Sequence, residues 1–454
     1  MKVKPTKFVI DEANPFANDL LNRENFADKL TNIVVANKDE LVIALDGQWG
    51  EGKTTFINMW QAKLVSEGFP CIYIDAFKID YTDDAFFPIA FEIDDFIKKK
   101  LGKEDKRREE LFEKTVEVSK RLLLWTGKVG LKALTLNAIG EAEIDSLSKV
   151  TDDIAEDVSE QFNKFAEEKF HAHQNTKGLF ESYRDTLSEI AAIVGKTEKP
   201  LIIIIDELDR CRPKFAVQIL EKIKHFFSVE NVVFVLSVNQ EQLEHSIKAE
   251  YGVGIDANTY LQKFVDIKAT LPRFNIIENS DSISQYQRNL FKSYGIVESL
   301  QYVNNHMSFF HLVACLLSKN KISYRQSERV MLNIKILVSS FRQDNIYYIN
   351  LLLIAFVSYL VTIRPNIIED IYSGRMTHDK LAEINDIKTI ESRDLQNTID
   401  DLKRYINYCF KDREEINSDD GFYVFYQQTS TERGIHSNPL LGLVEILNSF
   451  SYLK

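Results

Sequence analysis

The first candidate site is one unbroken motif, the segment G-Q-W-G-E-G-K-T, which matches the pattern G-x-x-x-x-G-K-[ST] in full. A loop of this kind binds phosphate, because its glycines let backbone N–H groups turn toward an anion and the following helix adds a favourable partial charge. Lys53 is predicted to reach the β- and γ-phosphates as a catalytic residue, and the Thr54 hydroxyl is predicted to bind Mg²⁺. The alternative is a glycine-rich turn without a ligand. The residues assigned to nucleotide binding are Gly47, Gln48, Trp49, Gly50, Glu51, Gly52, Lys53, Thr54 and Thr55.

A second candidate site is the acidic pair that follows the apolar run Leu201–Ile205. Asp206 is predicted to hold Mg²⁺ through its water shell, because this ion prefers oxygen ligands and keeps several waters. Glu207 is predicted to act as the general base that polarises the attacking water. An apolar strand that ends in an acid is by itself weak evidence, since many strands end in a solvated acid. Its pairing with the phosphate loop favours the catalytic interpretation.

Two arginines are further candidates, each with an alternative that the sequence leaves open. Arg210 could act as an arginine finger on the nucleotide of a neighbouring subunit, or it could form an internal pair with Asp209 or Asp206. Arg325 lies in the segment that opens an apolar helical run, where it could be the sensor arginine of a lid. The alternative for Arg325 is a solvated helix start.

The elements that must position these residues are five short apolar runs separated by helical patterns, which predicts an α/β parallel sheet with right-handed crossovers. An acid directly after the metal-binding acid indicates the P-loop NTPase branch with an extra strand between the two motifs. That branch predicts the sheet order 5-1-4-3-2. The runs, interpreted as buried parallel strands, are Leu41–Leu45, Cys71–Asp75, Leu201–Ile205, Val232–Leu236 and Ile267–Leu271.

In the predicted order the fourth strand lies beside the strand that carries the phosphate loop. Ser237 or Asn239 would then reach the γ-phosphate as a polar sensor, and Asn239 is the catalytic candidate. The alternative is that Asn239 only caps the helix predicted over Gln240–Tyr251, which asparagine does well. Both roles can hold at once.

Composition limits the classes of protein to consider. With 44% hydrophobic and 27% charged residues the chain is a folded protein, and its 17 glycines and 9 prolines in 454 residues favour long helices over many tight turns. We predict an NTPase core over residues 1–81 and 199–275 with a long helical insertion at 82–198. A helical lid-like domain at 276–375 and a C-terminal helical region at 376–454 complete an all-helical C-terminal part.

Compartment and membrane contact follow from three features. The four cysteines have no zinc spacing and the N-terminus has no apolar signal, so we expect reduced thiols and a cytoplasmic protein. The 18 uncharged residues Ile346–Ile363 are interpreted as a buried helix rather than a span. Residues 122–139 contain Lys128 and Lys132, which favours a buried or surface-lying amphipathic helix that could make peripheral membrane contact.

The chain resembles the KAP family of P-loop NTPases over roughly residues 15 to 335. The matching pieces are the approach segment Asp19–Arg23, the tryptophan-bearing phosphate loop, D-E-L-D-R-C after the third strand, Val238-Asn239, and Tyr260–Phe264 running to Leu271-Pro272. Trp49 together with Asp209–Cys211 is the most discriminating feature. The resemblance implies an ATPase core related to the AAA+ and STAND groups, with a helical domain after the sheet. It also implies scaffolding at membranes and, in bacteria, exclusion of phage.

The sequence departs from the family pattern at three places. Asp75-Ala76-Phe77 stands where an N-A-W segment is frequent, and Asn239 stands where an aspartate is common. The insertion also lacks the clean membrane span that many members have between the two nucleotide motifs.

The function expected from these observations is Mg²⁺-dependent binding and hydrolysis of ATP, controlled by contact with another subunit or a partner protein. A role in defence against phage is implied by the family resemblance alone. One alternative is a slow nucleotide switch that assembles partners, most simply as a homo-oligomer. Another is an ATPase stimulated by nucleic acid, which the net charge of −12 does not encourage. The preference for ATP over GTP is left open.

Overall fold

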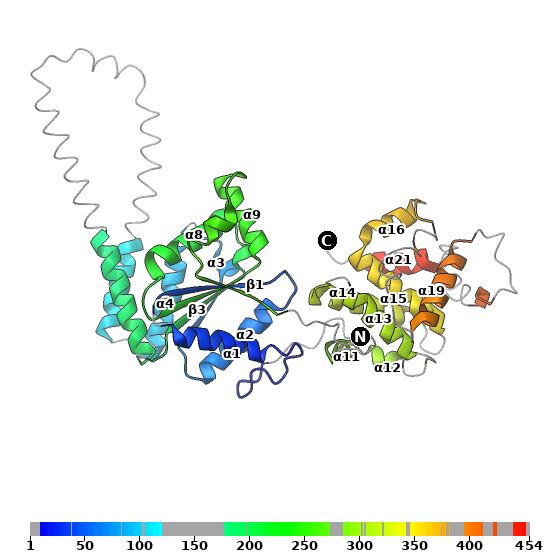
Figure 1. The fold of residues 1–454 in the computed structure, drawn as a ribbon, viewed down its shortest axis with the longest axis horizontal. Coiled ribbons are helices and arrows are strands. Elements are labelled where there is room, and N and C mark those ends of the chain that lie inside the picture. The colour runs from blue at the N-terminus through cyan, green and yellow to red at the C-terminus, as the bar shows by residue number, and fades with distance from the viewer. Residues whose placement is uncertain are drawn as a thin grey trace, which may run out of the picture.

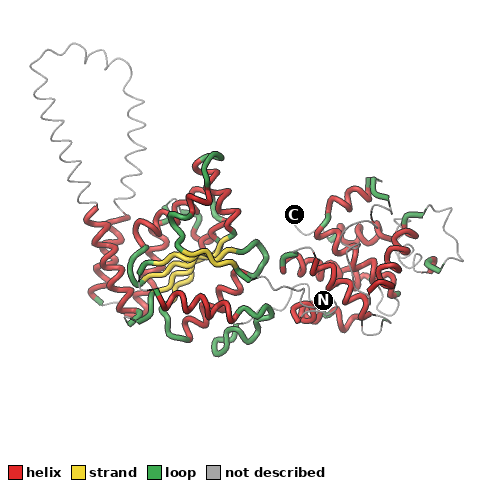
Figure 2. Tube along the Cα trace, in the orientation of Figure 1, coloured by secondary structure: helices red, strands yellow, loops and turns green. Residues whose placement is uncertain are grey.

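The computed structural model separates the chain into a lobe built on a sheet and a lobe made of helices (Figure 1). All strands lie in the first of these, which we call the sheet lobe, while the helical lobe contains none among its described residues (Figure 2). The residues described are 10–37, 39–82, 84–101, 105–119, 177–196, 198–272, 285–300, 303, 306–319, 322–341, 346–373, 375–377, 381, 395–411, 421–424 and 439–450.

The sheet has five strands in the order β2-β3-β4-β1-β5, and every neighbouring pair is parallel. This is the predicted order 5-1-4-3-2 seen from the other edge, so both the fold class and the strand order are confirmed. The strands are β1 (Leu41–Asp46), β2 (Cys71–Asp75), β3 (Leu201–Asp206), β4 (Val232–Val238) and β5 (Ile267–Thr270).

Helices cover both faces of this sheet, which is why its central strands are continuous apolar runs. One face packs against α1 (Glu24–Ala36) and α2 (Lys53–Ser66), where Trp60 is fully buried. The other face packs against α4, α8 and α9. The remaining elements of this lobe are α3 (Ala76–Ile79), α4 (Phe86–Leu101), η2 (Leu208–Arg210), α8 (Pro213–Lys222), the π-helical turn η3 (Ile223–Phe227), α9 (Gln240–Tyr251) and α10 (Ala257–Leu261).

The prediction of a buried strand is wrong in one place, at β5. Burial alternates along this strand, and Lys268 and Thr270 are exposed. The reason is its position, because β5 pairs only with β1 and forms the edge of the sheet. A lysine on an edge strand also discourages pairing with another chain.

The described ends of the insertion are helical. Residues 106–119 and 177–194 form two helices that are joined where Lys114 donates to the Thr186 hydroxyl at 2.6 Å. They are anchored to the sheet lobe by aromatic packing, in which the Phe86 ring lies 5.6 Å from Tyr183 and 5.3 Å from Phe227. The segment 122–139, with its expected membrane contact, lies outside the described residues.

The helical lobe is built around α15 (Tyr348–Ile363), in which every residue from Ile349 to Leu360 is buried. The interpretation of Ile346–Ile363 as a core helix is therefore confirmed. One hydrophobic core runs from Leu290 to Leu447 through this lobe. Its other helices are α11 (Gln285–Ser293), α12 (Ile296–Leu300), α13 (His306–Lys319), α14 (Tyr324–Ser340), α16 (Pro365–Tyr372), α19 (Gln396–Cys409) and α21 (Pro439–Ser449).

No single helix in the described residues has the length and apolar composition needed to cross a membrane. Among the residues that the structure describes, one pair of helices, α15 and α16, meets that test of length and composition when taken together, and the two are bent by 108° at Arg364.

Candidate functional site

The phosphate loop, Gly47–Thr54, connects β1 to α2 at the carboxyl edge of the sheet. Gly50 and Gly52 have φ angles of +83° and +78°, in the left-handed region that favours glycine. The Gly47 N–H donates to the Val238 carbonyl at 3.1 Å, which ties the loop to β4. Glu51 closes the loop on itself, because its carboxylate accepts from the Gln48 N–H at 3.0 Å.

Lys53 begins α2 with its side chain buried, and its ammonium donates to the Gly47 carbonyl at 2.5 Å and to the Gln48 carbonyl at 3.4 Å. Burial lowers the pKa of Lys53. The nearby carboxylates that oppose this shift are Asp209, Asp206, Asp46 and Glu51. The ammonium is thus held at the loop rather than extended into water, as a phosphate ligand requires.

The metal candidates Asp206 and Thr54 come to the same side of the sheet. Side chains alternate along a strand, so Asp206 shares the face of Ile204, which is the face that α2 covers. Thr54 lies in the first turn of α2 and is partly exposed, and Thr55 beside it is exposed. The Asp206 carboxylate accepts from the Tyr73 hydroxyl at 3.1 Å and from the Glu207 N–H at 2.9 Å.

This donor set fits Mg²⁺ with nucleotide bound. A hydroxyl and a carboxylate supply hard oxygen ligands, and phosphate oxygens and water complete the shell that this ion prefers. Within the described ranges no cluster of three or more His, Cys, Asp or Glu could hold a metal ion by itself.

Glu207, the candidate general base, has a constrained backbone. It adopts a left-handed backbone with φ of 61°, which is costly for a residue other than glycine and frequent at functional sites. Burial raises the pKa of Glu207, the charges of Asp206, Asp75 and Asp209 raise it further, and Arg210 opposes the shift. A carboxyl group with a raised pKa is better matched to proton transfer near neutral pH.

Arg210 forms an ion pair with Glu207, with 2.9 Å between Nη2 and Oε1. The sequence-based alternatives for an internal partner were Asp209 and Asp206, and both are wrong as the ion-pair partner. The three-residue spacing in the short helix η2 brings Arg210 back over Glu207. The Arg210 side chain remains 37% exposed.

Asp209 instead contacts the phosphate loop, where the Trp49 indole N–H donates to its carboxylate at 2.5 Å. Asp209 is buried, whereas the Trp49 side chain is 46% exposed. The two residues that best distinguish the motif therefore touch each other and join the phosphate loop to the acidic segment. Neither sequence pattern alone predicts this contact.

Asn239 caps α9, because its side-chain oxygen accepts from the Gln242 N–H at 3.4 Å. The capping role is thus present, and the sensor role stays a prediction. Ser237 is fully buried on the face of Val235, and its hydroxyl finds no hydrogen-bond partner in the described part of the chain. A buried hydroxyl without a partner is rare. Ser237 lies on β4, directly opposite Leu45 of the neighbouring strand β1.

The helical lobe reaches the phosphate loop through the start of α14. The Arg325 N–H donates to the Gly50 carbonyl at 3.3 Å, and a Cβ added at Gly50 would lie 2.8 Å from that of Arg325. Ser323 caps α14 in a reciprocal capping box with Gln326. Arg325 therefore lies beside the loop, and contact between its exposed side chain and a nucleotide stays a prediction.

A cleft of about 360 Å³ opens beside the loop and is lined by Gly47, Gln48, Asn239 and Lys268, among others. The Asp46 carboxylate connects two other residues that line the cleft. It pairs with the Lys268 ammonium at 3.2 Å and accepts from the Gln240 N–H at 2.9 Å.

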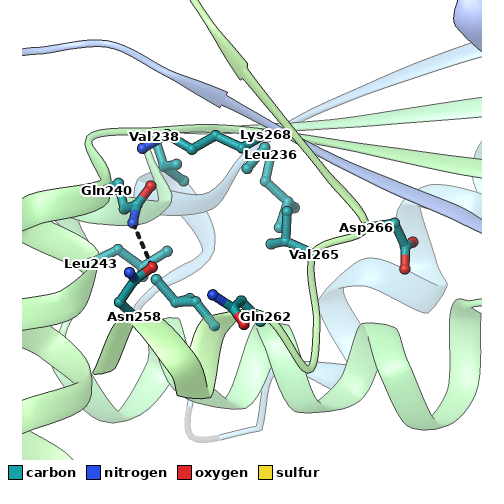
Figure 3. A pocket seen from close by; sticks show the side chains of 11 residues that line it. Leu236, Val238, Gln240, Leu243, Asn258, Gln262, Val265, Asp266 and Lys268 are labelled. Atoms are coloured by element: carbon teal, nitrogen blue, oxygen red, sulfur yellow. Dashed lines mark hydrogen bonds between the residues drawn. The ribbon is translucent and has the colours of Figure 1, made fainter. Parts of the chain in front are cut away.

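A second pocket of about 210 Å³ shares Gln240 and Lys268 with this cleft and runs toward α10. Its walls include Leu236, Val238 and Leu243, and two further lining residues are joined where the Gln240 side chain donates to the Asn258 side chain at 3.3 Å (Figure 3). The sequence predicted neither pocket, since each combines residues from strands and helices far apart in the chain.

Three comparisons with known proteins give the following matches. The model of the KAP family P-loop domain matches residues 23–341. An uncharacterized protein of Methanocaldococcus jannaschii is 28% identical over 178 residues, which is 37% of this chain and 89% of that protein. The ORC2 protein of Aeropyrum pernix, solved as ADPNP and ADP complexes, aligns with 98% of this chain and 97% of its own at 12% identity, with a TM-score of 0.35.

Proposed function

The chain belongs to the KAP family of P-loop proteins, and from that premise we propose that it binds MgATP at Gly47–Thr54 and hydrolyses it. The observation that carries the proposal is the convergence of Lys53, Asp206 and Glu207 at one edge of the sheet. The charge of Asp206 influences both of the others, because it raises the pKa of Lys53 and that of Glu207.

Each residue has a proposed role. The loop amides and the Lys53 ammonium bind the phosphates, and Thr54 and Asp206 hold Mg²⁺, which neutralises charge that develops on the phosphates. Glu207 orients water and accepts its proton. Asn239, at the end of β4, and Arg325, in the helical lobe, contact the phosphates as sensor residues. The Ser237 hydroxyl, which has no hydrogen-bond partner among the described residues, supports a polar contact from β4 as well.

The test is phosphate release from ATP by the purified chain with Mg²⁺ or with EDTA, and with GTP in place of ATP. Lys53→Met should abolish nucleotide binding, because it removes the ammonium and keeps the length of the side chain. Lys411→Met is the matched control, since this lysine lies beyond α19 in the helical lobe. Equal binding by the Lys53 variant and the control would refute the site.

We propose that contact between subunits controls the rate, with Arg210 acting on a neighbouring nucleotide. Its side chain is partly exposed, and leaving the internal pair would free Glu207 in the same step. A mixture of Glu207→Gln and Arg210→Ala subunits tests this. The first variant supplies an intact arginine and the second an intact base, so the mixture should turn over faster than either alone. A rate equal to the mean of the two variants would exclude the trans role.

A second candidate function is a slow nucleotide switch that assembles partners. The Glu207–Arg210 ion pair favours it, because a base held by a cation is poorly placed for rapid turnover. Fewer than one phosphate released per subunit, together with a particle mass that depends on ATP, would support the switch over the ATPase. Adding DNA or RNA to the same assay tests stimulation by nucleic acid.

The cellular compartment and the biological role are also proposals. None of the four cysteines, all of which the structure describes, forms a disulfide, which is consistent with a cytoplasmic protein. The expected role in phage exclusion rests on the family resemblance.

A further inference from the structure

Arg23, directly before α1, is a buried cation beside the phosphate loop. Its side chain is 2% exposed although arginine is charged at any physiological pH. The Asp19 carboxylate accepts from the Arg23 N–H and, at 3.0 Å, from the Leu21 N–H, so the preceding turn fixes where the side chain enters the fold. Burial lowers the pKa of Arg23, against the opposing effect of Tyr324, Asp19 and Glu51.

The guanidinium of Arg23 binds two backbone carbonyls from distant segments. Its Nη1 donates to the Glu51 carbonyl at 2.9 Å, inside the phosphate loop. Its Nε and Nη2 donate to the Pro272 carbonyl at 3.1 and 2.9 Å, just past the end of β5. The rigid fork of arginine makes such a double contact possible, and lysine cannot reproduce it.

The contact with Glu51 determines how the loop presents its next amide. A peptide group is planar and trans, so its C=O and N–H point in opposite directions. When Arg23 holds the Glu51 carbonyl on its own side, the Gly52 N–H of the same peptide is turned away from Arg23. A phosphate cradle needs such inward N–H groups, with carbonyls directed outward.

The same guanidinium also reaches the helical lobe. Its Cζ lies 5.6 Å from the centre of the Tyr324 ring, within cation–π range. Tyr324 is the first residue of α14, and its ring packs on Tyr286 at 4.9 Å. Its neighbour Arg325 donates to the Gly50 carbonyl. Two consecutive loop carbonyls are therefore held, one by the N-terminal segment and one by the helical lobe.

We propose that Arg23 is a positioning residue that orients the Gly52 amide for phosphate and couples the phosphate loop to the helical lobe through Tyr324. The proposal rests on the proposed nucleotide site, because phosphate binding gives the orientation its purpose. Arg23 itself need not touch the nucleotide.

The first test measures the Kd for ATP and for ADP in the full chain. Arg23→Gln should weaken both about tenfold, because a charge-assisted hydrogen bond to the loop is lost and both nucleotides carry the β-phosphate. Arg23→Lys should recover part of the affinity through one carbonyl. Arg108→Gln is the matched control, since it breaks a half-buried ion pair with Asp94 away from the loop. Wild-type affinity in Arg23→Gln, or an equal loss in the control, would overturn the proposal.

The second test is a double-mutant cycle with Tyr324→Leu, which removes the ring face and keeps an apolar side chain. Tyr324→Leu should weaken ATP binding in the wild-type background and have little further effect in Arg23→Gln. Tyr324→Phe keeps the ring and should bind as the wild type does. Additive losses in the double variant would contradict the coupling.

The third test is hydrogen exchange without nucleotide, which keeps the proposal separate from the ATPase assignment. Arg23→Gln should speed exchange at residues 50–53 and 323–327 together, whereas Arg108→Gln should not. Faster exchange in only one segment, or in neither, would overturn the coupling. If the wild-type chain failed to bind ATP, the proposed function would fall and this exchange result would still decide whether Arg23 joins the two lobes.

Discussion

Arg210 and Glu207 form an ion pair in which Nη2 and Oε1 are 2.9 Å apart, so the best candidate for the general base is held by a cation three residues away. Glu207 lies in a left-handed turn after β3, and this turn directs its side chain back toward Arg210. The pair therefore affects both the position of the carboxylate and its affinity for a proton.

The first prediction concerns pH. A general base must be deprotonated, so kcat/KM should rise with pH through the pKa of Glu207 in the free protein. Burial already raises this pKa and the charge of Arg210 lowers it. Removing that charge in Arg210→Ala should raise the pKa and move the acid limb of the pH–rate profile to higher pH.

The control for this shift is Arg404→Ala, whose side chain is 72% exposed on α19. It should leave the profile unchanged. An acid limb in Arg210→Ala that stays in place or moves to lower pH would mean that the ion pair does not influence the base.

The second prediction concerns the contact between Trp49 and Asp209. Trp49→Phe removes the indole donor and leaves a buried carboxylate oxygen of Asp209 without it, at a cost of about 1–3 kcal/mol. We expect a several-fold weaker Kd for ATP, measured by calorimetry. Asp209→Ala combined with Trp49→Phe should lose little more than the larger single effect, and fully additive losses would contradict a direct contact.

The third prediction uses two glycines that differ in their surroundings. Gly50→Ala places a Cβ 2.8 Å from that of Arg325 and forces alanine into a φ of +83°, so it should reduce ATP binding and hydrolysis strongly. Gly254→Ala meets nothing within 4 Å and should leave both unchanged. Similar activity in both variants would show that α14 does not rest on the phosphate loop.

The fourth prediction tests α15 as the core of the helical lobe. Leu353 is fully buried there, so Leu353→Ala should lower the free energy of unfolding by about 2–5 kcal/mol. Met307→Ala is the control, since that side chain is 52% exposed on α13 and surface changes are usually within about 0.5 kcal/mol. Urea denaturation followed by circular dichroism measures both, and an equally small loss in the two variants would contradict the buried position.

The sheet could be predicted, and the phosphate site proposed, because their signals are local. An apolar run followed by its motif fixes both a strand and the residues at its carboxyl end, so β1 with Gly47–Thr54 and β3 with Asp206 followed from a few adjacent positions. The predicted order 5-1-4-3-2 already places the fifth strand at the edge of the sheet, and the exposure of Lys268 agrees with that position. The apolar run by itself does not distinguish an edge strand from a central one.

Contacts between distant residues were beyond sequence reasoning. Arg23 and Pro272 are 249 positions apart, and Trp49 and Asp209 are 160 apart. Arg23 was visible only as part of an approach segment, and Tyr73 only as one apolar position in a strand. Their roles depend on individual side-chain contacts, of Arg23 with Glu51 and Pro272 and of Tyr73 with Asp206, and a predicted strand order does not specify such contacts.

The most direct test of the central claim is phosphate release from ATP by the wild-type chain and by Glu207→Gln, each with Mg²⁺ and with EDTA. The wild type should hydrolyse ATP only with Mg²⁺, and Glu207→Gln should bind ATP equally well and turn over about 10²–10⁴-fold more slowly, as expected when a general base is lost. Absence of Mg²⁺-dependent hydrolysis by the wild type, or an unchanged rate in Glu207→Gln, would contradict the account.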